Sequence, residues 1–389
     1  MPAEPSRDCY DVIVVGSGPA GATAALTLAK QGISVLILEK ATLPRYKTCG
    51  GGVVHRAAAA LPVDISSAIE RDCYRAEMHL LDANLHFVTQ RSTPIVSMCM
   101  RDKLDFSLVI AAQEMGAKLQ SECEVLDLKS SNEAVELKTS AGLRQARFVL
   151  AADGAMSLVA RKAGWPETRD LIPALEYEVK VSNELLNRFG ESARFDFGVV
   201  PYGYGWVFPK KAHLSIGLLS MQRRAINLNE MFMQYLRLIG IDKTESLERH
   251  GFLIPVQPRQ GPFMRARVLL TGDAAGFADP VTGEGITFSI LSGQLAARAL
   301  LEGNLNAHRI SEIYQSALAK TILPELWWGR RLAKLLYGYP RLRTRLFRRY
   351  GTKLSEAVTD LVMGKLSYRK IIFNPRNYLK LFSAEARLD

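Results

Sequence analysis

The stretch that decides the fold is Tyr10-Asp-Val-Ile-Val-Val-Gly16-Ser-Gly18-Pro-Ala-Gly21, where an apolar, β-branched run meets closely spaced glycines. An alanine-rich segment follows through Gln31, and a second apolar run extends from Ser34 to Glu39. These patterns predict a strand over 10–15, a helix over 20–31 and a strand over 34–39. The chain therefore begins with a predicted βαβ unit.

The glycine spacing has a specific use in such a unit. The first glycine permits a tight turn, the second lets the backbone approach a pyrophosphate, and the third lets helix and strand pack closely. Glu39 follows Gly21 by 18 residues and ends the second strand, where a carboxylate can accept both ribose hydroxyls. Similar glycines also occur in ordinary turns, but the strands, helix and acid in register favour a dinucleotide site.

A second glycine-rich segment favours FAD over NAD as the dinucleotide. Residues 269–286 read Leu-Leu-Thr-Gly272-Asp273-Ala-Ala-Gly-Phe-Ala-Asp-Pro280-Val-Thr-Gly283-Glu-Gly285-Ile286. They predict a strand, a turn with an acid, and a loop that opens a helix over 286–301. Asp273 can bond flavin ribityl hydroxyls, and the amides that start the helix can stabilise negative charge on the reduced ring. A purely structural strand-turn-helix is the alternative.

Four blocks, in the same order, resemble flavoproteins of the para-hydroxybenzoate hydroxylase fold. They are residues 16–21 with Glu39, residues 101–105, residues 152–157 and residues 272–285. The resemblance covers residues 10–300 and implies an FAD-dependent oxidoreductase. It also implies that Arg101 contacts the flavin nucleotide and that the Asp153-Gly pair shapes the same pocket.

Two further motifs resemble those of the geranylgeranyl reductase family. Pro44-Arg45-Tyr-Lys-Thr-Cys49-Gly50-Gly51-Gly52 is similar to its RxxxCGGG signature, and Pro201-Tyr-Gly-Tyr204-Gly-Trp206-Val-Phe208-Pro-Lys210 to its PxxYxWxFP signature. The family usually continues with Gly-x-Gly, whereas Ser215-Ile-Gly217 keeps one of these glycines. The resemblance implies an enzyme that saturates isolated double bonds of a polyprenyl chain by hydride transfer from reduced FAD.

The motifs together give a set of residues expected to contact the cofactor. They are Gly16, Gly18, Pro19, Ala20, Gly21, Glu39, Lys40, Arg45, Cys49, Gly50, Gly51, Arg101, Asp153, Gly272, Asp273, Pro280, Gly283, Gly285 and Ile286.

The predicted substrate wall is the aromatic motif. Tyr204, Trp206 and Phe208 alternate along a strand, so they face one side and offer the apolar surface that a polyprenyl chain requires. Lys210, at the end of the motif, is assigned to the same site. A sheet that packs its own aromatics into a core is the alternative.

Reduction of an isolated alkene also needs a proton, for which the catalytic candidates are Cys49, Tyr204 or a flavin-associated water. Cys49 is alternatively a passive thiol in a loop where only the glycines matter, because thiol reactivity depends on pKa and exposure.

Two other functions compete with the reductase. One is a flavin monooxygenase or halogenase of the same fold, and the other is an electron-transfer flavoprotein that docks at a membrane. The motifs around Cys49 and Trp206 favour the reductase, and no cysteine cluster for an iron–sulfur centre supports the electron-transfer protein. No second dinucleotide pattern occurs, so the electron donor is either NAD(P)H, bound transiently, or ferredoxin.

The predicted fold class is α/β, or α+β overall, with a Rossmann-type FAD-binding domain, an antiparallel-sheet substrate domain and a helical C-terminal region. A helix is predicted over 102–115, and strands over 119–128, 135–139, 147–151, 175–181, 194–200 and 268–270. The FAD-binding domain is expected to be discontinuous, over 8–60, 97–164 and 262–308. Residues 61–96 and 165–261 form the predicted substrate or catalytic domain, and 309–389 the basic helical region.

The net positive charge comes from the end of the chain. Residues 1–325 contain 35 Lys+Arg and 35 Asp+Glu, whereas residues 326–389 contain 15 and 4, which accounts for the whole net charge of +11. Bases interleaved with leucines and aromatics favour an interfacial helix on an anionic membrane. The alternative is a helix that packs its leucines on the catalytic domain. Nucleic acid is not an expected partner, because no reading motif accompanies the charge.

The remaining composition indicates a cytoplasmic protein, with peripheral contact at the cytoplasmic membrane face. The five cysteines include no CxxC pair and the six histidines no metal-ligand spacing, so neither a disulfide framework nor a metal site is predicted. Residues 1–11 do not resemble a signal peptide, and no apolar run is long enough to span a membrane.

Overall fold

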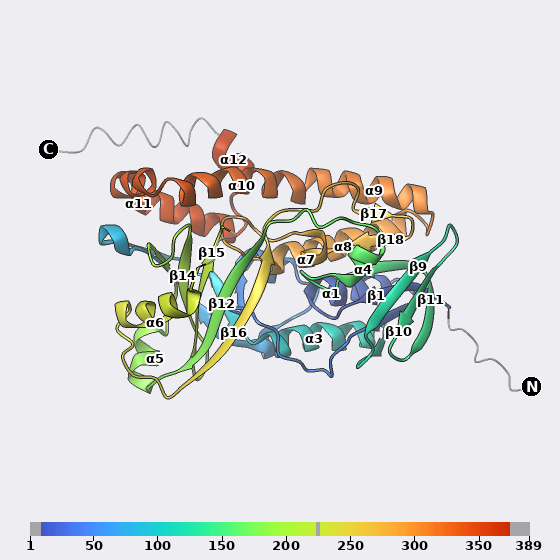
Figure 1. The fold of residues 1–389 in the computed structure, drawn as a ribbon, viewed down its shortest axis with the longest axis horizontal. Helices are drawn as coiled ribbons and strands as arrows, with labels where there is room; N and C mark the ends of the chain where they lie inside the picture. The colour runs from blue at the N-terminus through green and yellow to red at the C-terminus, as the bar shows by residue number, and fades with distance from the viewer. Residues whose placement is uncertain (1–8, 223–225, 374–389) are drawn as a thin grey trace, which may run out of the picture.

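The computed structural model describes residues 9–222 and 226–373. Two parts of the expectations above lie outside the described residues, namely the segment 1–8 and the end of the basic region, 374–389. Figure 1 shows two sheets at opposite ends of the molecule, with helices from the C-terminal part along one side.

The first sheet carries the βαβ unit. Its central strands run parallel in the order β18, β11, β1, β2, β8, and β17 pairs antiparallel with β18. These strands are β1 (Cys9–Val15), β2 (Val35–Leu38), β8 (Lys118–Gln120), β11 (Gly142–Ala151), β17 (Met264–Arg265) and β18 (Val268–Leu270). The hairpin partners β9 (Val125–Ser130) and β10 (Val135–Thr139) extend from β11.

Helices α1 (Pro19–Ala29), α3 (Arg101–Glu114) and α8 (Ile286–Glu302) accompany this sheet. A Cβ on Gly293 would lie 2.3 Å from the Ala20 carbonyl oxygen, so α1 and α8 pack with their backbones in close approach. Short helices α4 (Leu158–Lys162) and α7 (Gly272–Ala275) follow β11 and β18. The turns that follow β1, β11 and β18 therefore lie at the carboxyl ends of parallel strands, where dinucleotides bind in such sheets.

The second sheet has seven strands in the order β16, β12, β15, β14, β13, β5, β6, antiparallel except between β13 and β5. They are β5 (Arg75–Leu80), β6 (Leu85–Gln90), β12 (Leu171–Lys180), β13 (Ser192–Phe197), β14 (Gly203–Pro209), β15 (Leu214–Ser220) and β16 (Ser246–Pro255). Helices α5 (Asn183–Phe189) and α6 (Leu228–Leu238) belong to the same part of the chain.

A small third sheet contains β3 (Gly52–Val54), β7 (Val96–Cys99) and β4 (Ile69–Cys73), with β7 in the centre. Short helices lie close by in sequence: α2 (His55–Ala60), η1 (Ser66–Ala68) and η2 (Leu81–Ala83). β3 continues directly from the Cys49–Gly52 loop, so this sheet fixes the direction of that loop.

The basic region is helical, as predicted, over its described residues, 309–373. It comprises α9 (Ala307–Lys320), α10 (Ile322–Gly338), α11 (Pro340–Val362) and α12 (Tyr368–Phe373). α9 and α10 run along one edge of the molecule in Figure 1, and α11 packs on β6. Gly351 permits this packing, since a Cβ there would lie 1.9 Å from the Phe87 ring.

The predicted element types are confirmed except in one place. The predicted strand over 119–128 is two strands, because Glu122 adopts a left-handed φ of +54° and ends the first of them. β8 then pairs with β2, and β9 with β10.

Candidate active site

The GxGxxG turn connects β1 to α1 and is built by close contacts. Gly16 has a φ of +101°, and a Cβ there would lie 2.4 Å from the Ala152 carbonyl oxygen. A Cβ on Gly21 would lie 2.0 Å from the Gly16 carbonyl oxygen. The first and third glycines therefore allow the turn and the helix packing expected of them.

Gly18 instead faces open space. A Cβ there would meet nothing closer than Arg45 Nη2 and Arg101 Nη2, each at 3.9 Å. Gly18 is also the N-cap of α1 and makes no side-chain cap. Helix amides beside two guanidinium groups form an anion site, so the residues present fit a pyrophosphate here.

Asp105, on α3, holds both arginines in place. Arg101 donates to it through Nε at 2.8 Å and Nη2 at 2.9 Å, and Arg45 Nη1 donates at 3.1 Å. The Asp105 carboxylate is fully buried, and its hydrogen bonds hold both guanidinium groups in fixed positions. Asp105 was not predicted as a site residue, although it lies four positions after Arg101 on the same helix face.

Glu39 is an ionised acceptor at the end of β2. Its Oε2 accepts hydrogen bonds from the Ser17 hydroxyl at 2.6 Å and the Ser17 amide at 3.1 Å, and lies 3.3 Å from Arg45 Nε. Burial acts to raise the pKa of Glu39, but Ser17 and Arg45 outweigh it and lower the pKa. An ionised carboxylate at this position fits the ribose-binding role expected from the sequence.

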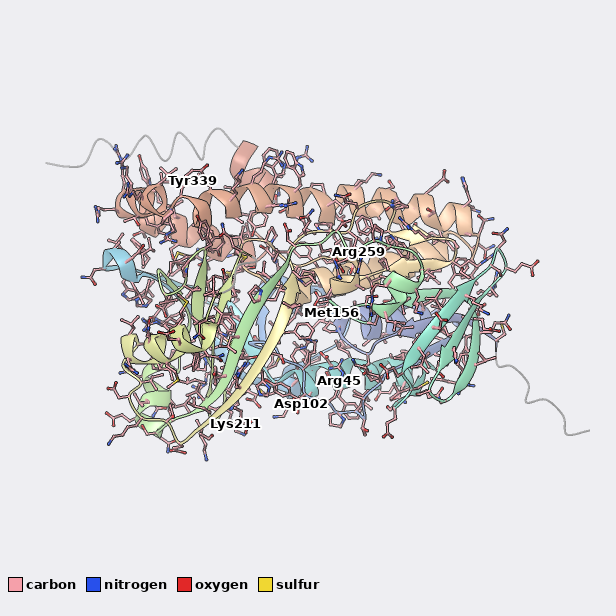
Figure 2. All side chains as sticks on the ribbon, in the orientation of Figure 1. Arg45, Asp102, Met156, Lys211, Arg259 and Tyr339 are labelled. Carbon is pink, nitrogen blue, oxygen red and sulfur yellow. The ribbon has the colours of Figure 1, made fainter. Side chains whose placement is uncertain are left out.

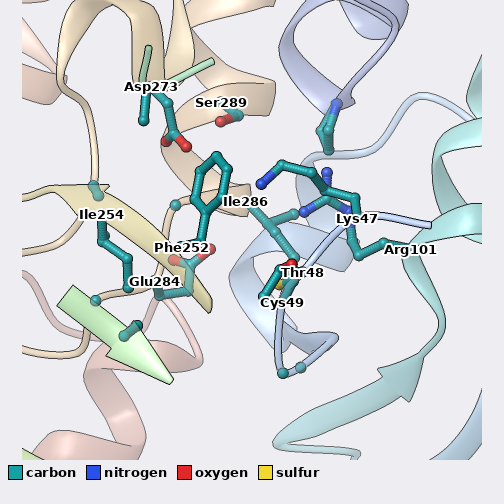
Figure 3. Close-up of a pocket in the computed structure, with 18 of the residues that line it drawn as sticks. Lys47, Thr48, Cys49, Arg101, Phe252, Ile254, Asp273, Glu284, Ile286 and Ser289 are labelled. Atoms are coloured by element: carbon teal, nitrogen blue, oxygen red, sulfur yellow. The ribbon is translucent and has the colours of Figure 1, made fainter. Parts of the chain in front are cut away.

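The second glycine-rich motif faces these arginines across the cavity. Figure 3 shows Asp273 on one side, with Lys47 and Arg101 reaching from the other. Burial raises the pKa of Asp273 against the opposing effect of Lys47 and Arg101. Burial and Arg101 lower the pKa of Lys47 to about 8. Lys47 was not predicted as a site residue, although it lies between Arg45 and Cys49 in the sequence.

The loop from α7 to α8 is shaped by Asp279. Its Oδ1 accepts the backbone amides of Val281 at 2.9 Å and Thr282 at 3.1 Å. Gly285, at the N-cap of α8, and Ile286 line the cavity. The start of a long helix is thereby presented to the site, as the flavin assignment requires.

The two motifs with a reductase resemblance form a single wall. A Cβ on Gly50 would lie 3.0 Å from Trp206 Nε1 and 3.1 Å from the Phe208 ring. A Cβ on Gly52 would also lie 3.1 Å from that ring. Gly51 has a φ of +64°, and a Cβ there would lie 2.0 Å from the Cys99 carbonyl oxygen. Each glycine of the Cys-Gly-Gly-Gly run is thus explained by packing.

Lys210 does not lie where the sequence prediction placed it. It is fully buried and does not line the cavity. Its Nζ donates to the carbonyl oxygens of Gly50 at 2.7 Å and Cys99 at 2.8 Å. A buried ammonium requires such partners, so Lys210 holds the glycine loop from behind and does not face a substrate.

Tyr204, Trp206 and Phe208 do line the cavity, as predicted. The Tyr204 hydroxyl donates to the Thr282 carbonyl oxygen, and burial raises the pKa of its phenol. Its geometry is that of an anchor for the loop rather than a proton donor. Trp206 Nε1 is buried and, among the described residues, has no hydrogen-bond partner.

Cys49 lies half-buried on the cavity wall. Its backbone amide donates to Glu176 Oε2 at 2.9 Å, and its sulfur accepts the Gly51 amide at 3.4 Å. Glu176 Oε1 accepts the Ser215 hydroxyl at 2.5 Å. Burial and the nearby Glu178 raise the pKa of Glu176 to about 7. Glu176 also lines the cavity, so a carboxyl with a raised pKa lies next to the cysteine.

Four predicted cofactor residues have supporting positions. Asp153 lines the cavity, but its oxygens accept the Ser157 hydroxyl at 2.5 Å and the Val159 amide at 3.0 Å, which caps α4. Gly21, Gly272 and Pro280 are absent from the lining and lie behind it. The other predicted cofactor residues line the cavity, namely Gly16, Gly18, Pro19, Ala20, Glu39, Lys40, Arg45, Cys49, Gly50, Gly51, Arg101, Asp273, Gly283, Gly285 and Ile286.

One cavity of about 820 Å³ joins the nucleotide and aromatic regions. It extends to α10 and α11, where its lining includes side chains that the sequence did not assign to the site: Leu336, Tyr337, Phe347, Ser355, Val358, Thr359 and Val362. The two hydroxyls of this set are already hydrogen-bonded, that of Ser355 to Thr89 and that of Thr359 to the Ser355 carbonyl. Phe252 and Ile254 of β16 also line the cavity (Figure 3). The cavity is therefore charged at the nucleotide end and apolar towards the C-terminal helices.

His79 and His86 are brought together by the β5–β6 pairing, which their sequence spacing did not suggest. Glu77 Oε2 lies 3.3 Å from His79 Nε2 and 3.6 Å from His86 Nε2. Arg75 Nη2 lies 3.5 Å from the other oxygen of this carboxylate. Burial and the neighbouring His79 lower the pKa of His86, so this cluster is a hydrogen-bonded group at the sheet edge.

An N-terminal βαβ unit, a charged pyrophosphate cradle and a second glycine-rich turn together define an FAD-dependent oxidoreductase. Residues 9–303 match the FAD binding domain family. A digeranylgeranylglycerophospholipid reductase of Methanothermobacter thermautotrophicus is 30% identical over 85% of this chain and 88% of its own. A chloroplastic geranylgeranyl diphosphate reductase of Nicotiana tabacum is 32% identical over 75% of this chain and 66% of its own.

Solved structures agree on the fold. A geranylgeranyl bacteriochlorophyll reductase-like protein of Thermoplasma acidophilum has a TM-score of 0.77 and 24% identity, covering 96% of this chain and 99% of its own. The halogenase PltM, in complex with phloroglucinol and FAD, has a TM-score of 0.70 and 18% identity, covering 97% and 86%. This chain belongs to the geranylgeranyl reductase family of FAD-dependent oxidoreductases.

Proposed function

We propose that this enzyme saturates isolated C=C bonds of a polyprenyl chain. The observation that carries the proposal is the single wall made by the Gly50–Gly52 loop and the aromatic strand, which continues into an apolar part of the cavity lined by α10 and α11. The names of the relatives support a geranylgeranyl-type chain.

The apolar end of the cavity supplies what such a substrate needs. Leu336, Phe347 and Val358 offer no polar group to an alkene, so a chain is held there by shape and by exclusion of water. FAD, when bound and reduced, supplies a hydride to one alkene carbon, while the other carbon takes a proton. The wall around Cys49 and Trp206 has to hold the double bond at the boundary between the nucleotide and apolar regions.

The proton donor that we favour is on the Cys49 side. The Tyr204 hydroxyl is directed at the Thr282 carbonyl, and its raised pKa makes it a weaker acid. Cys49 lines the cavity and has Glu176 behind its backbone. A thiol at this position is the better placed of the two predicted catalytic residues.

The test is anaerobic reoxidation of the flavin. Protein reduced with dithionite should be reoxidised by geranylgeranyl diphosphate, or by an unsaturated prenyl ether lipid, with a gain of two hydrogens per saturated bond. Because dithionite supplies the electrons, NAD(P)H or ferredoxin need not be identified. Strict dependence on oxygen, with a hydroxylated or halogenated product, would assign the enzyme to the monooxygenase or halogenase class instead.

Trp206→Ala serves as the variant in the same assay. Loss of the indole opens the wall, so kcat/KM for a long prenyl chain should fall on the order of 100-fold while FAD stays bound. The flavin absorbance of the purified variant is the control. Loss of FAD with unchanged chain selectivity would place Trp206 in the structural core.

A further inference from the structure

The turn between α10 and α11 carries a mixed basic and apolar surface. We call it the α10–α11 corner, and its exposed members are Arg331, Lys334, Leu335, Tyr339, Arg341, Leu342 and Arg345. Leu335 is 40% exposed, Tyr339 54% and Leu342 39%, and the three lie close together in the sequence around the turn, interleaved with the bases. Figure 2 shows Tyr339 at an extremity of the molecule.

Of the four bases of this corner, Arg331 stacks on the Trp327 ring, 3.0 Å from its centroid. The other three, Lys334, Arg341 and Arg345, have no carboxylate partner among residues 9–222 and 226–373. Arg343, by contrast, is buried and lies 3.0 Å from Asp82. The helix therefore separates a base used for packing from bases directed outward.

The opposite faces of the same helices line the cavity. Leu336 and Tyr337 follow Leu335 in the sequence but point inward, and the Tyr337 hydroxyl donates to the Val281 carbonyl at 2.5 Å. Phe347 and Val358 of α11 line the cavity as well. The corner and the apolar end of the cavity therefore belong to the same two helices, α10 and α11.

We propose that the α10–α11 corner docks the enzyme on an anionic lipid bilayer. The inference that this docking brings the cavity to a prenyl substrate rests on the proposed function, whereas the docking itself does not. Outward bases are attracted to anionic headgroups, and Leu335, Tyr339 and Leu342 suit the boundary between headgroups and acyl chains. An acidic protein partner that recognises only the charge is the alternative, and it would leave these three apolar side chains in water.

The experiment is sedimentation of the full-length, FAD-loaded protein with vesicles. Phosphatidylcholine vesicles are compared with vesicles of phosphatidylcholine and phosphatidylglycerol. We expect binding to the anionic vesicles only, and weaker binding with added salt because exposed charges are screened. Lys334→Gln/Arg341→Gln/Arg345→Gln should lower the partition coefficient on the order of 100-fold, at roughly 5-fold per charge.

Two further variants make the test specific. Lys30→Gln/Lys129→Gln/Lys138→Gln removes three exposed bases outside the corner and should leave binding unchanged. Lys129 and Lys138 belong to β9 and β10, at the other end of the molecule in Figure 1, and Lys30 is the C-cap residue of α1. Leu335→Ser/Tyr339→Ser/Leu342→Ser keeps the charge and should also weaken binding.

Several results would overturn the proposal. One is an equal loss of vesicle binding in the corner variant, Lys334→Gln/Arg341→Gln/Arg345→Gln, and in the control variant that carries three Lys→Gln changes elsewhere. Another is the absence of binding to anionic vesicles at low salt. Binding that the serine variant retains in full would also overturn it, since the surface would then be a general cation site of the kind an acidic protein recognises. None of these readouts uses enzymatic activity, so a failed reductase assay does not decide the docking.

Discussion

Glu176 is an acid whose surroundings change its titration, and this has a measurable effect on stability. Burial and Glu178 raise its pKa from 4.5 to about 7 in the folded protein. The folded state therefore binds the proton more tightly than the unfolded state. Its contribution to stability is greatest below the unfolded pKa and is lost as pH rises through the folded pKa.

We expect Glu176→Gln to remove this pH dependence. The free energy of unfolding of the wild type should fall relative to the variant, by on the order of 3 kcal/mol, between about pH 4.5 and about pH 8. Denaturant unfolding of both proteins across this range measures the difference. Any pH-independent cost of the amide cancels in the comparison, so parallel curves for the two proteins would contradict the raised pKa.

The same residue shows what a sequence motif leaves unspecified. Ser215 stands where the family usually has glycine, and the structure explains the departure through its hydrogen bond to Glu176. Gly217 is retained because a Cβ there would lie 2.1 Å from the Trp206 ring. Sequence spacing predicts that Trp206 faces the site. The contacts of Ser215 and Gly217 are not predictable in this way, because they depend on the pairing of strands that are separate in the chain.

At the level of elements, the Cys49–Gly52 loop is fixed by contacts on both sides. Gly51→Ala should destabilise the protein by about 3 kcal/mol, because a left-handed φ and a clash with the Cys99 carbonyl act together. Gly32→Ala is the matched control, since Gly32 also has a positive φ, of +76°, but no atom within 4 Å of its Cβ position. It should cost about 1 kcal/mol, the strain alone.

Denaturant unfolding, followed by flavin fluorescence and by circular dichroism, compares the two alanine variants. Equal losses would mean that the loop yields to the extra methyl group and that Lys210 and Cys99 do not fix it.

Most elements are predictable because their signals are local. β18 is predicted at 268–270 as observed, since a short apolar run ends at the Gly272-Asp273 turn. The division of residues 119–128 is not predictable in this way, because Glu122 is not a residue type that marks a left-handed turn. The position of Lys210 was not predictable for a related reason: the strand pattern ends before it, and its carbonyl partners come from the Gly50 loop and from the end of β7.

At the scale of the whole molecule, the C-terminal helices complete the cavity. Their apolar faces are evident in the sequence. Such faces are expected both of an interfacial helix on a membrane and of a helix that packs on the catalytic domain. Which surface they cover is a tertiary property, so Leu336 and Phe347 could not be assigned to the site from periodicity. Packing on the domain is shown by the structure and leaves the outward bases free for the proposed docking. No helix among the described residues meets the length and apolarity needed to span a membrane.

Tyr368 joins α12 to the loop between α7 and α8, part of which lines the cavity. Its hydroxyl donates to Asp279 Oδ1 at 2.8 Å and Oδ2 at 3.0 Å, and Arg56 Nη2 lies 3.1 Å from Oδ2 and 3.2 Å from Glu284 Oε2. Asp279 in turn accepts the amides that shape the loop. Loosening α12 should therefore loosen the cover of the cofactor.

We expect Tyr368→Phe to speed FAD dissociation about 10-fold, the effect of losing one buried hydrogen bond to a carboxylate. Tyr235→Phe is the matched control, because the hydroxyl of Tyr235 is also buried and donates to a carboxylate, that of Asp196, away from the cavity. Both variants should lose about 2 kcal/mol of unfolding free energy, whereas only Tyr368→Phe should release FAD faster when the holoenzyme is diluted in a stopped-flow instrument and the fluorescence of the released FAD is followed. Equal dissociation rates would show that the C-terminal helices stabilise the fold without controlling the cofactor, because the loss of stability is common to both variants and only the contact with the Asp279 loop differs.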